Sequence, residues 1–83
     1  MSFQSALELP KDLEKGLLLL TAFGQKEVHI ENHGGITGFS SDRIDIRYKN
    51  GSLVLIGMDL KIEHYDSDEL EINGFIQEIS FVK

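Results

Sequence analysis

Three side chains of the kinds that bind metal ions lie close together in the sequence: His29, Glu31 and His33. Imidazole and carboxylate groups are common ligands of zinc and other transition metals. On an extended strand, however, His29 and His33 start about 13 Å apart, at roughly 3.3 Å per residue. The ligand atoms of one tetrahedral zinc ion lie only about 3–4 Å apart. We therefore expect His29 at the surface and His33 capping a turn, and we predict no metal site and no cofactor.

The other residues whose side chains could take part in catalysis or binding lack the partner residues that such a site needs. His64 falls on the apolar side of an alternating segment, and no motif links it to Ser80. The acidic run at 66–71 lacks the glycine and the spacing of an EF-hand calcium loop. Gly34-Gly35 is not followed by the lysine and hydroxyl residue of a phosphate-binding loop. We expect a protein that is not an enzyme.

Charge and composition exclude further classes of protein. The 83 residues carry a net charge of −6 and include no cysteine, so disulfides and thiolate metal sites are excluded. A nucleic-acid ligand needs a basic face, whereas acidic residues interrupt the only basic cluster, at 43–49. The longest apolar run, 17–23, is far shorter than the about 20 residues that span a bilayer. We predict a soluble, unexported chain that neither binds nucleic acid nor spans a membrane.

The elements that must position these residues are strands. Residues 43–49 alternate between apolar and polar, Asn50-Gly51 is the preferred pair for a tight hairpin turn, and 52–56 return. A two-residue turn at Asn50-Gly51 would pair Arg47 with Val54 and Ile46 with Leu55. One face of the hairpin is then apolar throughout, comprising Ile44, Ile46, Tyr48, Leu53 and Leu55.

A weak internal repeat extends this pattern to the end of the chain. When the sequence is compared with itself at an offset of 17 residues, Leu53 aligns with Leu70 and Gly57 aligns with Gly74. Each copy of the repeat is predicted to form a strand, a glycine kink and a second strand. We predict an all-β fold, a small antiparallel β-meander curled into a sandwich or barrel with glycine-kinked strands. Residues 1–15 form a short N-terminal lead-in, with one helical turn at 10–14, and 16–83 form a single domain.

One strand of the hairpin is apolar on both sides. Val54 and Ile56 share a face with Arg47, opposite the apolar face. Either a second layer of the protein or a partner must cover them. These residues are the candidate partner interface that follows from the strand pattern.

Several segments of the chain resemble the YabP/YqfC family of endospore sporulation proteins, closest to its YqfC branch. The resemblance rests on Leu9-Pro10-Lys11-Asp12, Ile30-Glu31-Asn32-His33-Gly34, Gly51, Leu55-Ile56-Gly57, Asp59-Leu60 and Ile72-Asn73-Gly74-Phe75-Ile76. The chain departs from the family pattern at 14–17 and at Gly34-Gly35. The motif at 30–34 is the most specific part, and it adds Asn32, His33 and Gly34 to the candidate interface.

The resemblance implies a small protein of the mother cell in an endospore-forming bacterium. It implies a role in spore formation, as an interaction or assembly module beside a membrane protein encoded next to it, at the outer forespore membrane. Two other classes stay open. One is a module that binds a small ligand or a metal through His29, Glu31 and His33. The other is a structural protein that forms homo-oligomers through exposed strand edges.

Overall fold

The computed structural model describes residues 17–83, which form six β-strands and no helix. The strands are β1 (Leu19–Phe23), β2 (Glu27–Glu31), β3 (Gly35–Phe39), β4 (Arg43–Tyr48), β5 (Gly51–Tyr65) and β6 (Glu69–Val82). All neighbours are antiparallel, in the order β1-β2-β6-β5-β4-β3, within one open sheet. The prediction of an antiparallel all-β fold is confirmed. The predicted helical turn and the lead-in at 1–15 lie outside the described residues.

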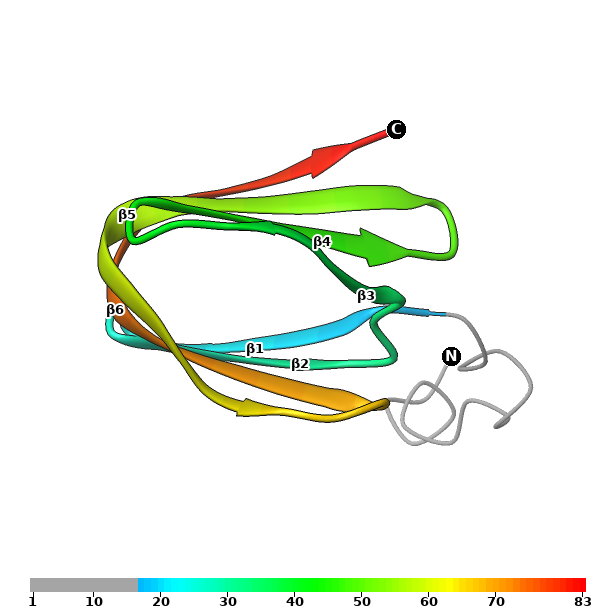
Figure 1. Ribbon diagram of the computed structural model, residues 1–83, viewed down its shortest axis with the longest axis horizontal. Coiled ribbons are helices and arrows are strands. Elements are labelled where there is room, and N and C mark those ends of the chain that lie inside the picture. The colour runs from blue at the N-terminus through cyan, green and yellow to red at the C-terminus, as the bar shows by residue number, and fades with distance from the viewer. Residues whose placement is uncertain (1–16) are drawn as a thin grey trace, which may run out of the picture.

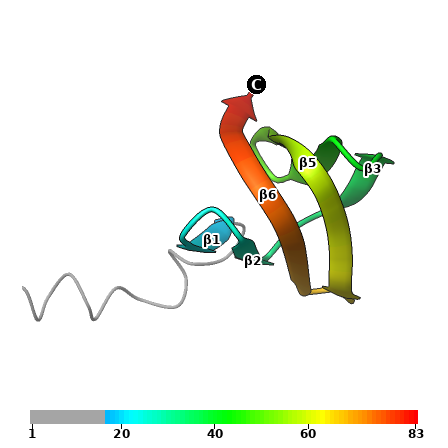
Figure 2. The ribbon, with the colours of Figure 1, turned by 90° about the vertical axis from the view of Figure 1, so that its left-hand side faces the viewer.

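The sheet is folded over on itself into two layers (Figure 1). The β4 layer contains β3, β4, the first half of β5 and the second half of β6. The β2 layer contains β1, β2, the second half of β5 and the first half of β6. Strands β3 to β6 form a meander, whereas the β1–β2 hairpin pairs with the opposite edge of β6. The two long strands run side by side through the bend and so join the layers (Figure 2).

The core lies between the layers because alternate residues of the strands point inward. Its fully or almost fully buried side chains are Val28, Ile30, Ile44, Ile46, Leu53, Leu55, Leu60, Leu70, Ile72 and Ile76. Leu18 and Leu20 pack against this core, whereas Leu17 and Leu19 are exposed. The apolar run that begins at residue 17 is therefore divided between the interior and the surface.

The two glycines of the internal repeat lie at the bend. Gly57 pairs with Ile76. A Cβ atom on Gly57 would lie 2.0 Å from the Phe75 carbonyl oxygen, which is closer than van der Waals contact allows. Gly74 adopts a φ of +139°, and its Cβ would lie 2.6 Å from the Asp59 carbonyl oxygen. Only a residue without a side chain lets the two strands approach this closely. The predicted glycine kinks are therefore confirmed.

The predicted hairpin is present, but its predicted register is wrong by two residues. Tyr48 pairs with Gly51, Arg47 with Ser52 and Asp45 with Val54, so the turn residues are Lys49 and Asn50. Gly51 belongs to β5 because β6 approaches it closely: a Cβ atom there would lie 2.3 Å from the Val82 carbonyl oxygen. A shift of two residues keeps every side chain on its predicted face.

Candidate functional site

The first candidate surface is the outer face of the β4 layer. Val54 and Ile56 alternate with the buried Leu53 and Leu55, so they point away from the core and are half-buried. Among residues 17–83, no strand lies over this face (Figure 1). Within residues 17–83, it is neighbouring side chains in the same sheet that partly bury Val54 and Ile56.

Polar side chains border these two residues on both sides. On β4, Arg43 Nε lies 2.9 Å from Asp45 Oδ1, and these residues pair with Ile56 and Val54. On β6, Ser80 Oγ donates a hydrogen bond of 2.9 Å to Glu78, and these residues pair with the same two positions. The arrangement is a narrow apolar stripe between two polar rows. A narrow apolar centre with a polar rim is the composition of many transient protein interfaces.

The Asn32-His33-Gly34 turn connects β2 to β3, and only part of it is accessible. Asn32 has a φ of +66°, its backbone N–H donates to the Asp68 carbonyl, and its side-chain amide donates to the Leu17 carbonyl. His33 is 8% exposed, whereas Asn32 and Gly34 are exposed. Asn32 and Gly34 are therefore the members of this turn that a partner can reach.

His33 holds the turn in place from inside the protein. Its Nδ1 accepts a hydrogen bond of 3.0 Å from the Gly35 N–H, so its Nε2 carries the proton and donates to the Asp66 carbonyl at 2.8 Å. The Tyr65 ring stacks on the imidazole at 5.3 Å between centroids. The predicted turn-capping role of His33 fits this geometry, although the cap reaches across to the β5–β6 turn.

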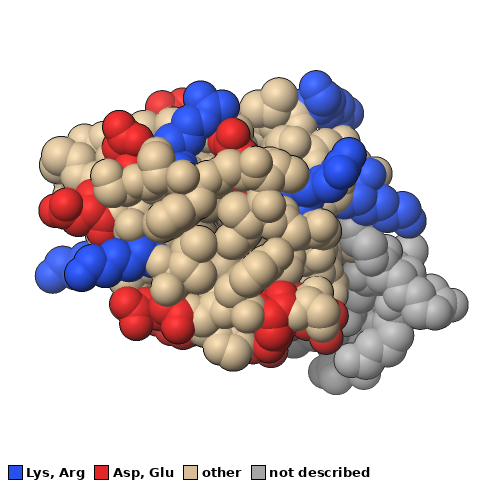
Figure 3. Space-filling view, in the orientation of Figure 1, with Lys and Arg blue, Asp and Glu red and all other residues tan. Residues whose placement is uncertain are grey.

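The turn and the apolar stripe meet at Arg47. The Gly34 N–H donates a hydrogen bond of 2.6 Å to the Arg47 carbonyl, and Arg47 lies on β4 diagonally adjacent to Val54. The Arg47 side chain is exposed on the same outer face. The structure thus places Gly34, Arg47, Val54 and Ile56 next to one another in one area, which we call the β4 surface. Asn32 lies apart from it at the end of β2, where it contacts Asp68 and Leu17. Figure 3 shows charged groups mainly around the margin of the visible face and uncharged atoms over its centre.

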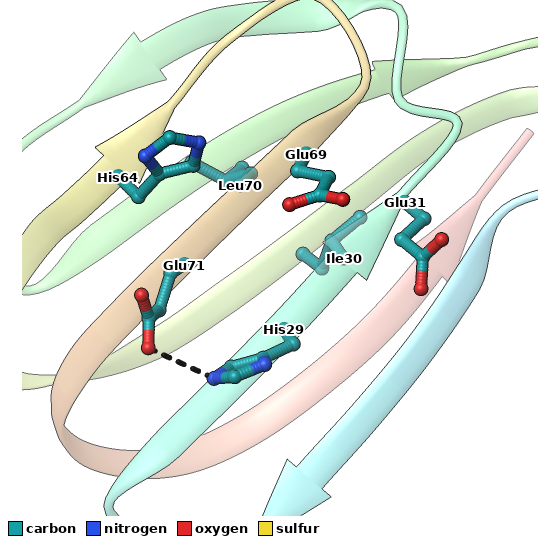
Figure 4. A pocket seen from close by; sticks show the side chains of 7 residues that line it. All are labelled: His29, Ile30, Glu31, His64, Glu69, Leu70 and Glu71. Atoms are coloured by element: carbon teal, nitrogen blue, oxygen red, sulfur yellow. Dashed lines mark ion pairs between the residues drawn. The ribbon is translucent and has the colours of Figure 1, made fainter.

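The metal-binding triad considered in the sequence, His29, Glu31 and His33, is not brought together. His29 and Glu31 point outward from the β2 layer, whereas His33 points into the protein. Instead, His29 lies next to two other carboxylates. Its Nε2 is 2.5 Å from Glu27 Oε2 and 2.9 Å from Glu71 Oε2. Figure 4 shows His29 and Glu71 beside a shallow hollow that His64 and Glu69 also line.

The contacts of this cluster shift the ionisation of its members. The hydrogen bond to Glu27, with the charges of Glu71 and Glu27, raises the pKa of His29 above its ordinary value. The same hydrogen bond with His29, and a second one with Glu71, lower the pKa of Glu27. Both shifts favour the charged forms. The two carboxylates therefore favour the protonated form of His29.

A second histidine and carboxylate group lies at the β5–β6 turn. His64 Nε2 is 2.8 Å from Asp66 Oδ2. Asp66 Oδ1 accepts hydrogen bonds from the backbone N–H groups of Asp68 and Glu69, and these lower the pKa of Asp66 to about 2. Asp66 is thus the residue that closes this turn. His64 is exposed, so the structure does not place it in the core.

Sequence reasoning missed Glu27 and Glu71 as neighbours of His29. Glu27 precedes His29 by two residues and therefore shares its face, which is a signal that the alternation of β2 contained. Glu71 gives no such signal, because its position depends on β2 pairing with β6. In that pairing, Glu71 lies directly opposite His29.

Comparison with known proteins identifies the relatives of this chain. The model of the YabP family matches residues 15–83, which is most of the sequence. The chain belongs to the YabP family. It is also 30% identical over 78 residues to a Bacillus subtilis (strain 168) protein named uncharacterized protein YqfC, an alignment that covers 94% of this chain and 84% of the relative. The predicted family resemblance is therefore confirmed, and membership of the YabP family is consistent with a sporulation-related protein. No helix is present among residues 17–83, so none that could cross a membrane is found there.

Proposed function

We propose that this YabP-family protein is a non-enzymatic interaction module of the mother cell that acts in spore formation with a membrane protein at the outer forespore membrane. Family membership supports the role in sporulation. The observation that carries the interaction role is the β4 surface. It presents two apolar side chains on a face that no other strand of residues 17–83 covers.

The composition of the β4 surface favours a partner segment with a few apolar anchors. Val54 and Ile56 supply the centre, and the Arg43–Asp45 pair supplies a rim with both signs of charge. Arg47 adds an exposed cation at the end next to Gly34. Interface energy concentrates in a few central residues, so changing the centre should cost more affinity than changing the rim.

The test is co-purification with the membrane protein encoded by the adjacent gene, produced together with this chain. We expect the wild type to be retained and a Val54→Asp, Ile56→Asp variant to lose at least about tenfold in affinity. Phe23→Asp is the matched control, because Phe23 is 51% exposed and lies at the end of β1 in the β2 layer, away from the β4 surface. Circular dichroism must show that each variant is folded.

Retention of the folded double variant at wild-type affinity would exclude Val54 and Ile56 from the contact. Loss of binding by both the double variant and Phe23→Asp would point to a general effect of added negative charge. If the wild type itself is not retained, the proposed partner is wrong. If the double variant does not fold, the two side chains support the fold and are not a dispensable contact surface.

Self-assembly is a second candidate function, and β1 is the feature that favours it. Strand β1 forms one edge of the sheet and consists of Leu-Leu-Thr-Ala-Phe, with no charge, proline or glycine. Natural edge strands are usually protected by such residues or by bulges. The opposite edge, β3, follows this rule, because it contains two glycines and a register irregularity between Ile36 and Gly38.

Two copies of β1 would pair antiparallel around Thr21, with Leu19 opposite Phe23 of the other copy. Sedimentation over a range of concentrations tests this pairing, and a concentration-dependent dimer is expected. Thr21→Lys should abolish the dimer, because two lysines would face each other and Thr21 is exposed in the monomer. A wild type that sediments as a monomer up to about 100 μM would contradict self-assembly at cellular concentrations.

A further inference from the structure

Three ligand-type side chains converge on the outer face of the β2 layer, on the other side of the molecule's core from the β4 surface. Glu27 and His29 are two positions apart on β2, and His29 lies directly opposite Glu71 on β6. One ligand atom from each residue can be chosen such that all three lie within 4.8 Å of one another. The two strands that supply them are hydrogen-bonded neighbours, so their backbones fix this arrangement.

The cluster offers the hydrogen of one imidazole nitrogen to two carboxylates. The two carboxylates both approach the Nε2 atom of His29, at 2.5 and 2.9 Å. Nε2 carries at most one hydrogen, which can point at only one of the two oxygens. A divalent cation placed between the three groups would displace the Nε2 proton to solvent and bind the imidazole lone pair and both carboxylates at the same time.

The surroundings leave room for such an ion and hold the histidine ring in place. Beside His29 and Glu71 is an open hollow of about 350 Å³ (Figure 4). Water can therefore complete the coordination of an ion from the solvent side. On β1, the Phe23 ring packs against the His29 ring with 4.8 Å between centroids. This contact limits rotation of the imidazole away from the two carboxylates.

The comparison with the second histidine cluster decides which group is the better site. The ligand atoms of His64, Asp66 and Glu69 also lie within 4.8 Å of one another. However, Asp66 already accepts two backbone hydrogen bonds, and all three side chains are exposed at a turn. Glu27, His29 and Glu71 come from regular strands and are each half-buried. Ordering them around an ion therefore costs less side-chain entropy.

We propose that Glu27, His29 and Glu71 form a binding site for one divalent transition-metal ion of the zinc class. One nitrogen and two oxygen donors with an open position suit Zn²⁺, whereas Ca²⁺ and Mg²⁺ prefer oxygen ligands alone. The bound ion would connect β2 to β6. Its effect would be to fasten the β1–β2 hairpin onto the long strand, independently of any partner at the β4 surface.

Titration calorimetry and thermal unfolding of the full chain test the site, with ZnCl₂ as the probe and CaCl₂ as the comparison. We expect one Zn²⁺ per chain. At a hundredfold excess over the dissociation constant, the unfolding midpoint should rise by roughly 10–20 °C, because an ion that binds only the folded state stabilises it. His29→Ala and Glu71→Gln should each weaken binding by about tenfold or more.

Two matched controls separate this site from general attraction to an acidic surface. Glu31→Gln removes a neighbouring carboxylate on the same face of β2, and His64→Ala removes the histidine of the second cluster. Both variants should keep wild-type affinity. The proposal is overturned if Zn²⁺ binds more weakly than about 100 μM, if CaCl₂ binds as tightly, or if His64→Ala loses the ion and His29→Ala keeps it. An equal loss in all four variants would also overturn it.

Discussion

Replacing Gly74 with alanine tests whether the close approach of β5 and β6 at the bend holds the two layers together. Gly74 has a φ of +139°, a region that other residues enter at a cost of about 1–3 kcal/mol. The new Cβ atom would also lie 2.6 Å from the Asp59 carbonyl oxygen and 2.9 Å from Leu60 Cα. Because both neighbours are backbone atoms of β5, the strands must move apart, which costs about 1–3 kcal/mol more.

The expected total loss is about 2–6 kcal/mol for Gly74→Ala. A protein of this size has a free energy of unfolding of roughly 4–12 kcal/mol, so the variant should lose a large share of its stability. Urea unfolding followed by circular dichroism measures this loss as a lower midpoint. The measurement should be made at low protein concentration, where association through strand edges does not contribute.

Gly24→Ala provides the matched control. Gly24 also has a positive φ, of +61°, but a Cβ atom there would have no heavy atom within 4 Å. Its substitution should therefore cost only the conformational penalty, about 1–2 kcal/mol. The difference between the two variants isolates the strand contact. Equal losses in both variants would refute the reasoning that close approach at Gly74 is what requires glycine.

Three further predictions concern polar residues. The wild type should lose stability as the pH falls from about 4 to about 2, because the pKa of Asp66 in the folded state is about 2 and its ordinary value is 3.8. The Asp66→Asn variant should lack this part of the acid dependence. Urea unfolding measured at each pH compares the two proteins. His33→Ala should lower the free energy of unfolding by about 2–4 kcal/mol, because it leaves the Gly35 N–H and the Asp66 carbonyl without their hydrogen-bond partner. A loss below about 1 kcal/mol would mean that water takes over the hydrogen bonds of the imidazole. Arg43→Ala should change the unfolding free energy by less than about 1 kcal/mol, because its ion pair with Asp45 is exposed, and a larger change in a thermal melt would contradict that view.

The faces of the hairpin and the positions of the kinks could be predicted because both depend on local sequence. Alternation places Ile44, Ile46, Leu53 and Leu55 on one face, and all four are buried. The register could not be predicted from the same signal. A shift of two residues leaves the alternation unchanged, and the deciding contact, between Gly51 and Val82, joins residues 31 positions apart in the sequence.

The position of His33 shows why alternation fails at the end of a strand. Continued alternation would put His33 on the outer face with His29. Asn32, however, adopts a left-handed φ of +66°, which asparagine tolerates better than most residues, and this turns the following side chain inward. The convergence of Glu71 on His29 was also beyond sequence reasoning. It depends on which strand lies beside β2, and nothing in either segment specifies its partner.

The pairing of β2 with β6 has a consequence for the order in which the chain folds. Glu27 pairs with Asn73, 46 positions further along the sequence. The β1–β2 hairpin is made early in the chain but finds its neighbour only in the last strand. Contacts between such distant residues slow folding, because a long loop must close before they form. We expect the β3–β6 meander to assemble first and the β1–β2 hairpin to dock afterwards. The interval between these steps would leave the β2-facing edge of β6 unpaired, and this is when the chain is most prone to aggregation.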